Sequence, residues 1–139
     1  MADSSAVDAA VVAKLSGDAT LMAITTDGVF FDVAKSGAQN FVIVSQVAHA
    51  DDYMFGGEAF EKFTYLVKVV MLTTVGTNVI TAAARVQTLL QDVVLTITGY
   101  THAKTVRAER IRYTEVDPGD QDKRWQHRGG LYEVWAVPT

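Results

Sequence analysis

The sequence predicts a single α+β domain in which two main helices pack on one mixed, antiparallel-rich sheet. Three observations indicate this class. The chain has 139 residues, the size of one ordinary domain. Its 49% hydrophobic and 20% charged residues, with 2 prolines, are typical of a folded protein. Its apolar patterns follow the order helix, strands, helix, strands, with no internal repeat or linker within residues 1–139.

The first predicted element is a helix near the N-terminus. Ser5 and Asp8 resemble a capping box at its start, and Gly17 suits the left-handed conformation that ends a helix. Asp18 then caps a second, short helical turn. The apolar side chains of the first helix recur at i, i+4 and i+8, as on a buried helix face: Val7, Val11 and Leu15.

Strands are predicted next. Residues 29–33 form a short strand, residues 35–40 have the composition of a loop, and residues 41–47 are rich in β-branched side chains. The longest candidate, residues 60–73, is apolar on both faces. A strand of this kind is covered on both sides, so we expect it at the centre of the sheet.

The second main helix is predicted over residues 79–90, with Thr77 or Asn78 as its cap. A strand over residues 93–98 is expected to follow and to break at Gly99. The apolar positions of the helix lie on one face, as expected for a helix packed on a sheet: Val79, Ala83, Val86 and Leu90.

The C-terminal part is predicted to be a long hairpin. Residues 100–116 are extended, residues 117–120 (Asp-Pro-Gly-Asp) form a turn, and residues 125–137 form the last strand. The Gly129–Gly130 pair inside that strand indicates a bulge or the close approach of another backbone.

Composition excludes several classes of protein. The absence of cysteine excludes disulfide scaffolds, thiolate metal sites and thiol nucleophiles. A net charge of -4 argues against a polycationic nucleic-acid coat. The sequence shows no secretory signal and no apolar run long enough to span a membrane, so we expect a soluble, cytoplasmic protein with no membrane partner.

No catalytic motif is recognised. The sequence lacks the phosphate-binding GxxxxGK[ST] pattern and the G-x-S-x-G nucleophile elbow. His49 with Asp51 and Asp52 is the nearest approach to an acid–base or metal cluster, but these residue types fit a solvated loop and no third partner is evident. We therefore expect no enzyme, no catalytic residue, no cofactor and no bound metal.

A segment that combines acids with large apolar side chains is the first candidate interface. Residues 49–61 are expected to form a long loop that exposes part of its aromatic surface. The alternative is a loop that folds back and buries its own aromatic side chains. The predicted contact residues are Asp51, Asp52, Tyr53, Met54, Phe55, Glu58 and Phe60.

A charge asymmetry is the second candidate feature. Residues 102–128 carry a net charge of +2, and the rest of the chain carries -6. On an uninterrupted strand Lys104, Arg110 and Arg112 would point to the same face. This face would contact nucleic-acid phosphates or a neighbouring subunit, or it would simply be a solvated face that protects a sheet edge.

The layout resembles the tail terminator (tail completion) family of long-tailed bacteriophages. The resemblance is one of pattern over nearly the whole chain and has no single diagnostic residue. It runs through the Ala-rich opening helix with its short second turn, the following strands, the second helix, a Leu-Thr-Ile-Thr-Gly-Tyr segment and a charged closing hairpin. The matching segments are residues 6–24, 28–33, 41–47, 63–72, 79–90 and 95–100.

The resemblance implies a structural virion protein at the tail–neck junction, assembled in the host cytoplasm. Such proteins form a hexameric ring that caps the completed tail tube, stops its polymerisation and presents the surface that joins the capsid. The implied partners are further copies of the chain, the tail tube protein and a head-completion or neck protein, with genomic DNA passing non-specifically through the centre. Lys104, Arg110 and Arg112 would form a charged face of the lumen or, because a strongly basic lumen would hinder that passage, a face toward a neighbouring subunit.

Two alternatives remain open from the sequence. The nearer one is another ring protein of the neck, such as a head-completion or connector component. The other is a small-ligand-binding domain or an enzyme of α+β class, with His49, Asp51 and Tyr53 at the mouth of a pocket.

Overall fold

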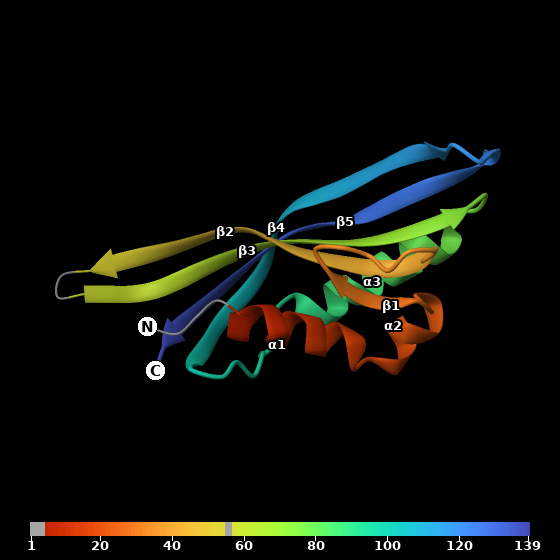
Figure 1. Cartoon of the computed structure of the whole chain (residues 1–139). Helices are drawn as coiled ribbons and strands as arrows, with labels where there is room; N and C mark the ends of the chain where they lie inside the picture. Colours follow the sequence, from red (N-terminus) through yellow and green to blue (C-terminus); the bar gives the residue numbers. More distant parts are fainter. Residues whose placement is uncertain (1–4, 55–56) are drawn as a thin grey trace.

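A strongly curved sheet with helices on one face makes up the protein (Figure 1). The computed structural model describes residues 5–54 and 57–139, with the side chains of residues 52–54, 57–59 and 121 outside the description. In these ranges the elements are α1 (Ser5–Ser16), α2 (Ala19–Ile24), β1 (Gly28–Phe31), β2 (Asn40–Met54), β3 (Gly57–Thr73), α3 (Thr77–Leu90), β4 (Tyr100–Asp117) and β5 (Asp120–Pro138).

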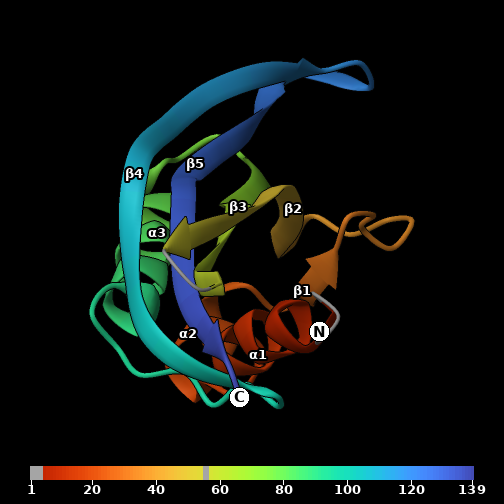
Figure 2. The same cartoon turned by 90° about the vertical axis from the view of Figure 1, so that its left-hand side faces the viewer.

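The sheet has the strand order β1-β2-β3-β5-β4. β1 runs parallel to β2, whereas the β2–β3, β3–β5 and β4–β5 pairs are antiparallel. The predicted α+β class is confirmed, and so is the central place of the predicted strand 60–73, which lies in β3. Seen from the end of the β2–β3 hairpin, β4 and β5 bend around α3 (Figure 2).

The main core lies between the sheet and the helices. The residues of β3 that face the helices are at most 2% exposed, because α1, α2 and α3 cover them: Phe63, Tyr65, Val67, Val69 and Met71. The predicted stripe of α1 is fully buried against them. On the opposite face a smaller apolar cluster gathers around Phe41 and Val70. The apolar side chains on both faces of β3 are therefore packed against other residues, as the sequence predicts.

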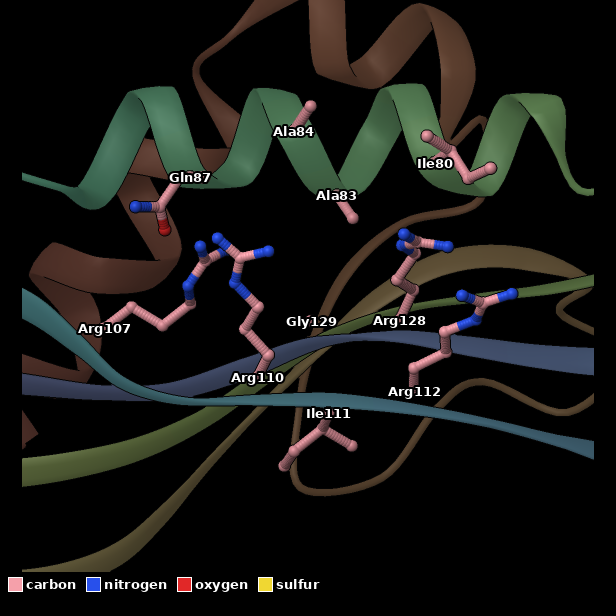
Figure 3. Close-up of a pocket in the computed structure, with 10 residues that line it drawn as sticks. All are labelled: Ile80, Ala83, Ala84, Gln87, Arg107, Arg110, Ile111, Arg112, Arg128 and Gly129. Carbon is pink, nitrogen blue, oxygen red and sulfur yellow. The ribbon is translucent and has the colours of Figure 1, made fainter.

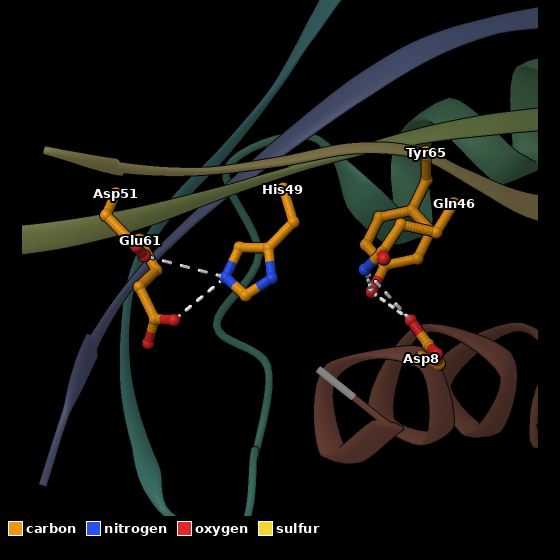
Figure 4. Close-up of polar contacts among 6 residues, drawn as sticks. All are labelled: Asp8, Gln46, His49, Asp51, Glu61 and Tyr65. Atoms are coloured by element: carbon orange, nitrogen blue, oxygen red, sulfur yellow. Dashed lines mark hydrogen bonds and ion pairs between the residues drawn. The ribbon is translucent and has the colours of Figure 1, made fainter. Parts of the chain in front are cut away.

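Polar contacts fix the helices to one another and to the sheet. The Asp18 carboxylate accepts a hydrogen bond from the Leu21 backbone N–H at 2.9 Å, which confirms the predicted cap of α2. The same carboxylate accepts two hydrogen bonds from Arg85 of α3, at 2.8 and 2.7 Å. The Arg85 hydrogen bond lowers the pKa of Asp18 to about 2. In α1, Asp8 accepts hydrogen bonds from Tyr65 and Gln46 of the sheet (Figure 4).

Three local expectations were wrong. Residues 49–54 and 57–61 are not a loop, because β2 and β3 pair through them up to Met54↔Gly57, with a shift of register between Asp52 and Tyr53. The turn-like and acidic composition of this segment therefore does not prevent cross-strand pairing. Residues 93–98 form no strand beyond the single bridge Ile97↔Tyr100, although Leu95 and Ile97 are buried in the core. The cap of α3 is Gly76, without a side-chain hydrogen bond, instead of Thr77 or Asn78.

Candidate functional site

Bulges in β4 decide which way its basic residues point. Arg107 pairs with Tyr132 and Glu109 with Leu131, so Ala108 is an extra residue in β4. Successive side chains of a strand point to alternate faces of the sheet. One extra residue therefore makes each later side chain of the strand point to the opposite face. A second bulge lies between His102 and Lys104.

The expectation that Lys104, Arg110 and Arg112 share one face is therefore wrong. Lys104 pairs with Trp135 on the face away from the helices, and its Nζ lies 5.2 Å from the centre of the Trp135 ring. Arg110 and Arg112 pair with Gly130 and Arg128 on the helix face. The strand is not uninterrupted, and the bulge at Ala108 separates the lysine from the two arginines.

The helix face of the β4–β5 hairpin instead holds an arginine cleft. Arg107, Arg110, Arg112 and Arg128 extend from the two strands toward α3, whose Ile80, Ala83, Ala84 and Gln87 form the opposite wall (Figure 3). The cleft has a volume of about 470 Å³. We use "arginine cleft" for this set of residues. Sequence reasoning missed Arg107 and Arg128, and no sequence signal revealed the bulge that gathers them.

Glycines allow the arginine stems to lie close to the sheet. A Cβ at Gly130 would lie 2.4 Å from the Glu109 carbonyl oxygen and 2.9 Å from Arg107 Cδ. A Cβ at Gly129 would lie 2.0 Å from the Val67 carbonyl oxygen of β3. The close backbone approach predicted for this glycine pair is thus confirmed, whereas the bulges of the hairpin lie in β4.

The arginine cleft is electrostatically unbalanced. Among the described residues, the ion pairs join none of its four arginines to a carboxylate. The sequence of α3 contains no acidic residue, and its Arg85 is paired with Asp18. Burial raises the pKa of Tyr132, whose hydroxyl donates to Gln87 Oε1 at 2.7 Å, while the nearby Arg107 and Arg110 act in the opposite direction. Such a surface favours an anionic ligand.

The predicted interface segment forms a projecting hairpin arm. The pairing of β3 with β5 begins at Glu61↔Ala136, so residues 52–54 and 57–60 pair only with each other. We call these residues the hairpin arm, and Figure 1 shows it extending beyond the rest of the molecule. Between Lys35 and Lys62 the sequence has no lysine or arginine.

The structure places the predicted contact residues as follows. Asp51, Asp52, Tyr53, Met54, Glu58 and Phe60 lie on the paired strands at the end of the hairpin. Phe60 is 39% exposed, as expected for a contact residue. The side chains of Asp52, Tyr53, Met54 and Glu58 are outside the description, and Phe55 lies outside the described residues.

A buried carboxylate lies at the base of the hairpin arm. A bulge at Val47 turns His49 and Asp51 toward the helix face, where they meet Glu61 of β3 (Figure 4). His49 Nε2 lies 2.8 Å from Glu61 Oε1 and 3.9 Å from Asp51 Oδ1. Glu61 is fully buried, and its Oε2 has no hydrogen-bond partner among the described residues.

Glu61 is the third partner that the sequence did not reveal. His49 lies on β2 rather than in a loop, and it stacks on Phe63 with ring centres 4.3 Å apart while remaining partly exposed. One imidazole and two carboxylates form a donor set that divalent cations accept, and the ligand atoms lie within 4.8 Å of one another. The contact between His49 and Glu61 also exists without a metal, because His49 Nε2 lies within hydrogen-bond distance of Glu61 Oε1.

Solved structures share this fold. A chain in the virion of a native gene transfer agent (GTA) particle has a TM-score of 0.72 at 20% identity, with 96% of each chain covered. A second solved structure, whose name states no function, has a TM-score of 0.60 at 18% identity, covering 100% of this chain and 98% of the other. No family model and no curated protein matches the chain. No helix in residues 5–54 and 57–139 is long and apolar enough to cross a membrane.

Proposed function

We propose that the chain is a structural virion protein that caps the completed tail tube of a phage-like particle as a ring of six. In this role it stops tube polymerisation and provides the surface that joins the head, with DNA passing through the centre. The observation that supports the virion role is the fold shared with a gene transfer agent virion chain over 96% of both chains. The tail-terminator role and the number six come from the resemblance of the sequence pattern.

The surface of the subunit fits assembly into a ring. A closed ring needs two different surfaces on each subunit that contact each other head to tail. The hairpin arm and the arginine cleft are two such unlike surfaces, on different parts of the sheet. A two-stranded ribbon is only marginally stable alone, which favours an arm that packs on a partner. The tail tube protein and a head-completion protein are the further partners of the proposed ring.

The test is assembly with and without the tube. The purified chain is mixed with tail tube protein and followed by native mass spectrometry and electron microscopy. We expect hexameric rings, on their own or at the ends of tubes, and tubes that stop growing when the chain is added. Monomers or dimers at every concentration and salt, together with unaltered tube growth and bare tube ends, would refute the proposal.

The same experiment separates the neighbouring role in the neck. Co-purification with a portal instead of the tail tube would assign the chain to head completion or to a connector. A ligand-binding role with His49, Asp51 and Tyr53 at a pocket mouth has less support, because the 470 Å³ cleft lies between α3 and the β4–β5 hairpin and is not lined by these residues.

A further inference from the structure

We propose that the arginine cleft of one subunit binds the acidic end of the hairpin arm of a second copy of this chain. This inference rests on the proposed ring, and it assigns the two surfaces that join neighbouring subunits. Asp52 and Glu58 of the arm, with Asp51 at its base, supply the carboxylates. Arg107, Arg110, Arg112 and Arg128 supply the guanidinium groups.

The cleft lacks the counter-charges that its arginines require. Four guanidinium groups line about 470 Å³, and none forms an ion pair among the described residues. Arg110 and Arg112 are exposed, while Arg107 and Arg128 are half-buried, so the set is both accessible and held in place. A guanidinium group binds a carboxylate through two parallel hydrogen bonds, which makes an acidic peptide segment the fitting ligand.

The chemistry of the arm matches both walls of the cleft. The arm carries Asp52 and Glu58, with Asp51 at its base, and the sequence has no lysine or arginine between Lys35 and Lys62. In the sequence these acids lie close to Tyr53, Met54 and Phe60. The wall opposite the arginines is mostly apolar: Ala83, Ala84 and Ile80 form it together with Gln87, and Ile80 is 48% exposed. The acids of the β4–β5 turn are a poorer match, because Lys123 and Arg124 follow them directly.

The arm cannot reach the cleft of its own subunit. The arm continues β2 and β3 past the end of β5, whereas the cleft lies over α3 on the helix face of β4 and β5 (Figures 1 and 3). A paired ribbon that continues the sheet does not fold back across its own helices. The contact is therefore between copies, and it is heterologous, which is the type that closes into rings.

Nucleic acid is the less fitting occupant of this cleft. The four guanidinium groups point toward α3 and not outward along an open strand face (Figure 3). Arg110 and Arg112 are exposed, but they face α3 across a cleft of about 470 Å³. Such a cleft admits a peptide segment more readily than the wide backbone surface of a double helix. Lys104, which lies on the other face of the sheet, is not part of this set.

Charge reversal with a matched control tests the contact. In the full-length chain, Arg110→Glu with Arg112→Glu is compared with Lys104→Glu, which reverses a charge on the other face of β4. We expect the arginine pair to raise the concentration needed for assembly by about tenfold or more, the equivalent of losing about 1.4 kcal/mol per contact. We expect Lys104→Glu to change the concentration needed for assembly by no more than about twofold. Adding Asp52→Arg and Glu58→Arg to the arginine variant is expected to restore its assembly, because the charges of both surfaces are then exchanged. Circular dichroism melting checks that each variant is folded.

Cross-linking gives an independent readout, because the natural chain has no cysteine. A chain with Asp52→Cys and Arg112→Cys is expected to form ladders of covalent oligomers up to a closed ring under mild oxidation. Each single variant alone is expected to stop at the dimer or to remain uncross-linked.

The outcomes distinguish the inference from the proposed function. Wild-type rings that tolerate the arginine reversal, or that lose assembly equally with Lys104→Glu, would overturn the inference and leave the ring standing. Arginine variants that assemble normally but lose retention of double-stranded DNA at low salt would overturn it in favour of nucleic acid. A wild-type chain that forms no ring, free or on tubes, would refute both.

Discussion

Single residues decide the chemistry of this surface more than its overall charge does. Ala108 has a small, uncharged side chain, yet as the extra residue of a bulge it sends Arg110 and Arg112 to the helix face. Val47 does the same for His49 and Asp51 in β2. At both places one inserted residue brings together side chains that regular alternation would have separated.

The pair of His49 and Glu61 leads to a prediction about stability. His49→Phe keeps the stacking on Phe63 but removes the group that lies 2.8 Å from Glu61 Oε1. Because Glu61 is fully buried, we expect the variant to lose about 1–3 kcal/mol of unfolding free energy in urea denaturation. Adding Glu61→Leu should recover most of this loss, since it removes the unpaired carboxylate. A double variant no more stable than the single one would contradict this account.

The Asp18 carboxylate leads to a prediction about pH. The pKa of Asp18 is lowered to about 2 in the folded protein, mainly by the hydrogen bond from Arg85. The unfolded chain therefore binds this proton first, so the stabilisation is complete above pH 3.8 and is lost as the pH falls through about 2. Asp18→Asn should melt at a lower temperature than the wild type at pH 6, and the difference should shrink toward pH 2.

A control for this experiment is Asp32→Asn, at an exposed position with a left-handed backbone (φ 66°) that asparagine also adopts. Its melting temperature should stay close to that of the wild type throughout the range. A gap between Asp18→Asn and the wild type that stays constant down to pH 2 would rule out the carboxylate as its source.

At the scale of elements, the β3–β5 pair controls the geometry of the sheet. These two central strands pair over thirteen positions from Glu61↔Ala136 to Thr73↔Arg124, and Gly129 lies within this ladder. A Cβ at this position would meet the Val67 carbonyl oxygen at 2.0 Å and the Lys68 Cα at 2.6 Å. Backbone atoms cannot move aside as a flexible side chain would, so the strands would have to separate.

Gly129→Ala is therefore expected to destabilise the fold by about 1–3 kcal/mol, measured by urea denaturation. Gly119→Ala, in the β4–β5 turn, is the matched control because its Cβ would meet only Asp117 Oδ2, at an ordinary 3.5 Å. Equal stability of the two variants would show that β3 and β5 are less closely packed than described.

At the scale of the whole molecule, the body and the hairpin arm are separable. The main core involves all three helices and the helix face of the sheet, and it ends at Phe63 and its neighbours. The residues of β3 that precede Glu61, which belong to the arm, do not pair with β5. We therefore expect the arm to contribute little to the stability of the fold.

Shortening the hairpin tests this separation. Replacing residues 52–60 by Asn-Gly, a pair suited to a two-residue turn, joins Asp51 directly to its partner Glu61. We expect a melting temperature close to that of the wild type and a complete loss of assembly by native mass spectrometry. Val116→Ser, at an exposed apolar position on the other hairpin, should assemble normally. A shortened chain that still forms rings would show that the arm is not a subunit contact.

Much of the fold was predictable because local patterns and burial agree. The stripe Val7, Val11 and Leu15, the cap Asp18 and the doubly apolar central strand are all present as predicted. The errors fall where local composition competes with pairing. Residues 49–61 contain turn-like glycines and acids in their sequence, yet the two strands pair as far as Met54↔Gly57. Leu95 and Ile97 show the opposite case, since they are buried without strand pairing.

The sequence by itself determined the class of the fold, the order of its elements and the wholly acidic character of residues 36–61, because periodicity and composition act locally. The tertiary structure alone decided that Arg107, Arg110, Arg112 and Arg128 share a cleft, that Lys104 does not, and that Glu61 is buried beside His49. The physical reason is register. A bulge depends on how two strands that are distant in the sequence pair with each other. One extra residue moves every side chain beyond it to the opposite face of the sheet, and no local sequence pattern reveals this.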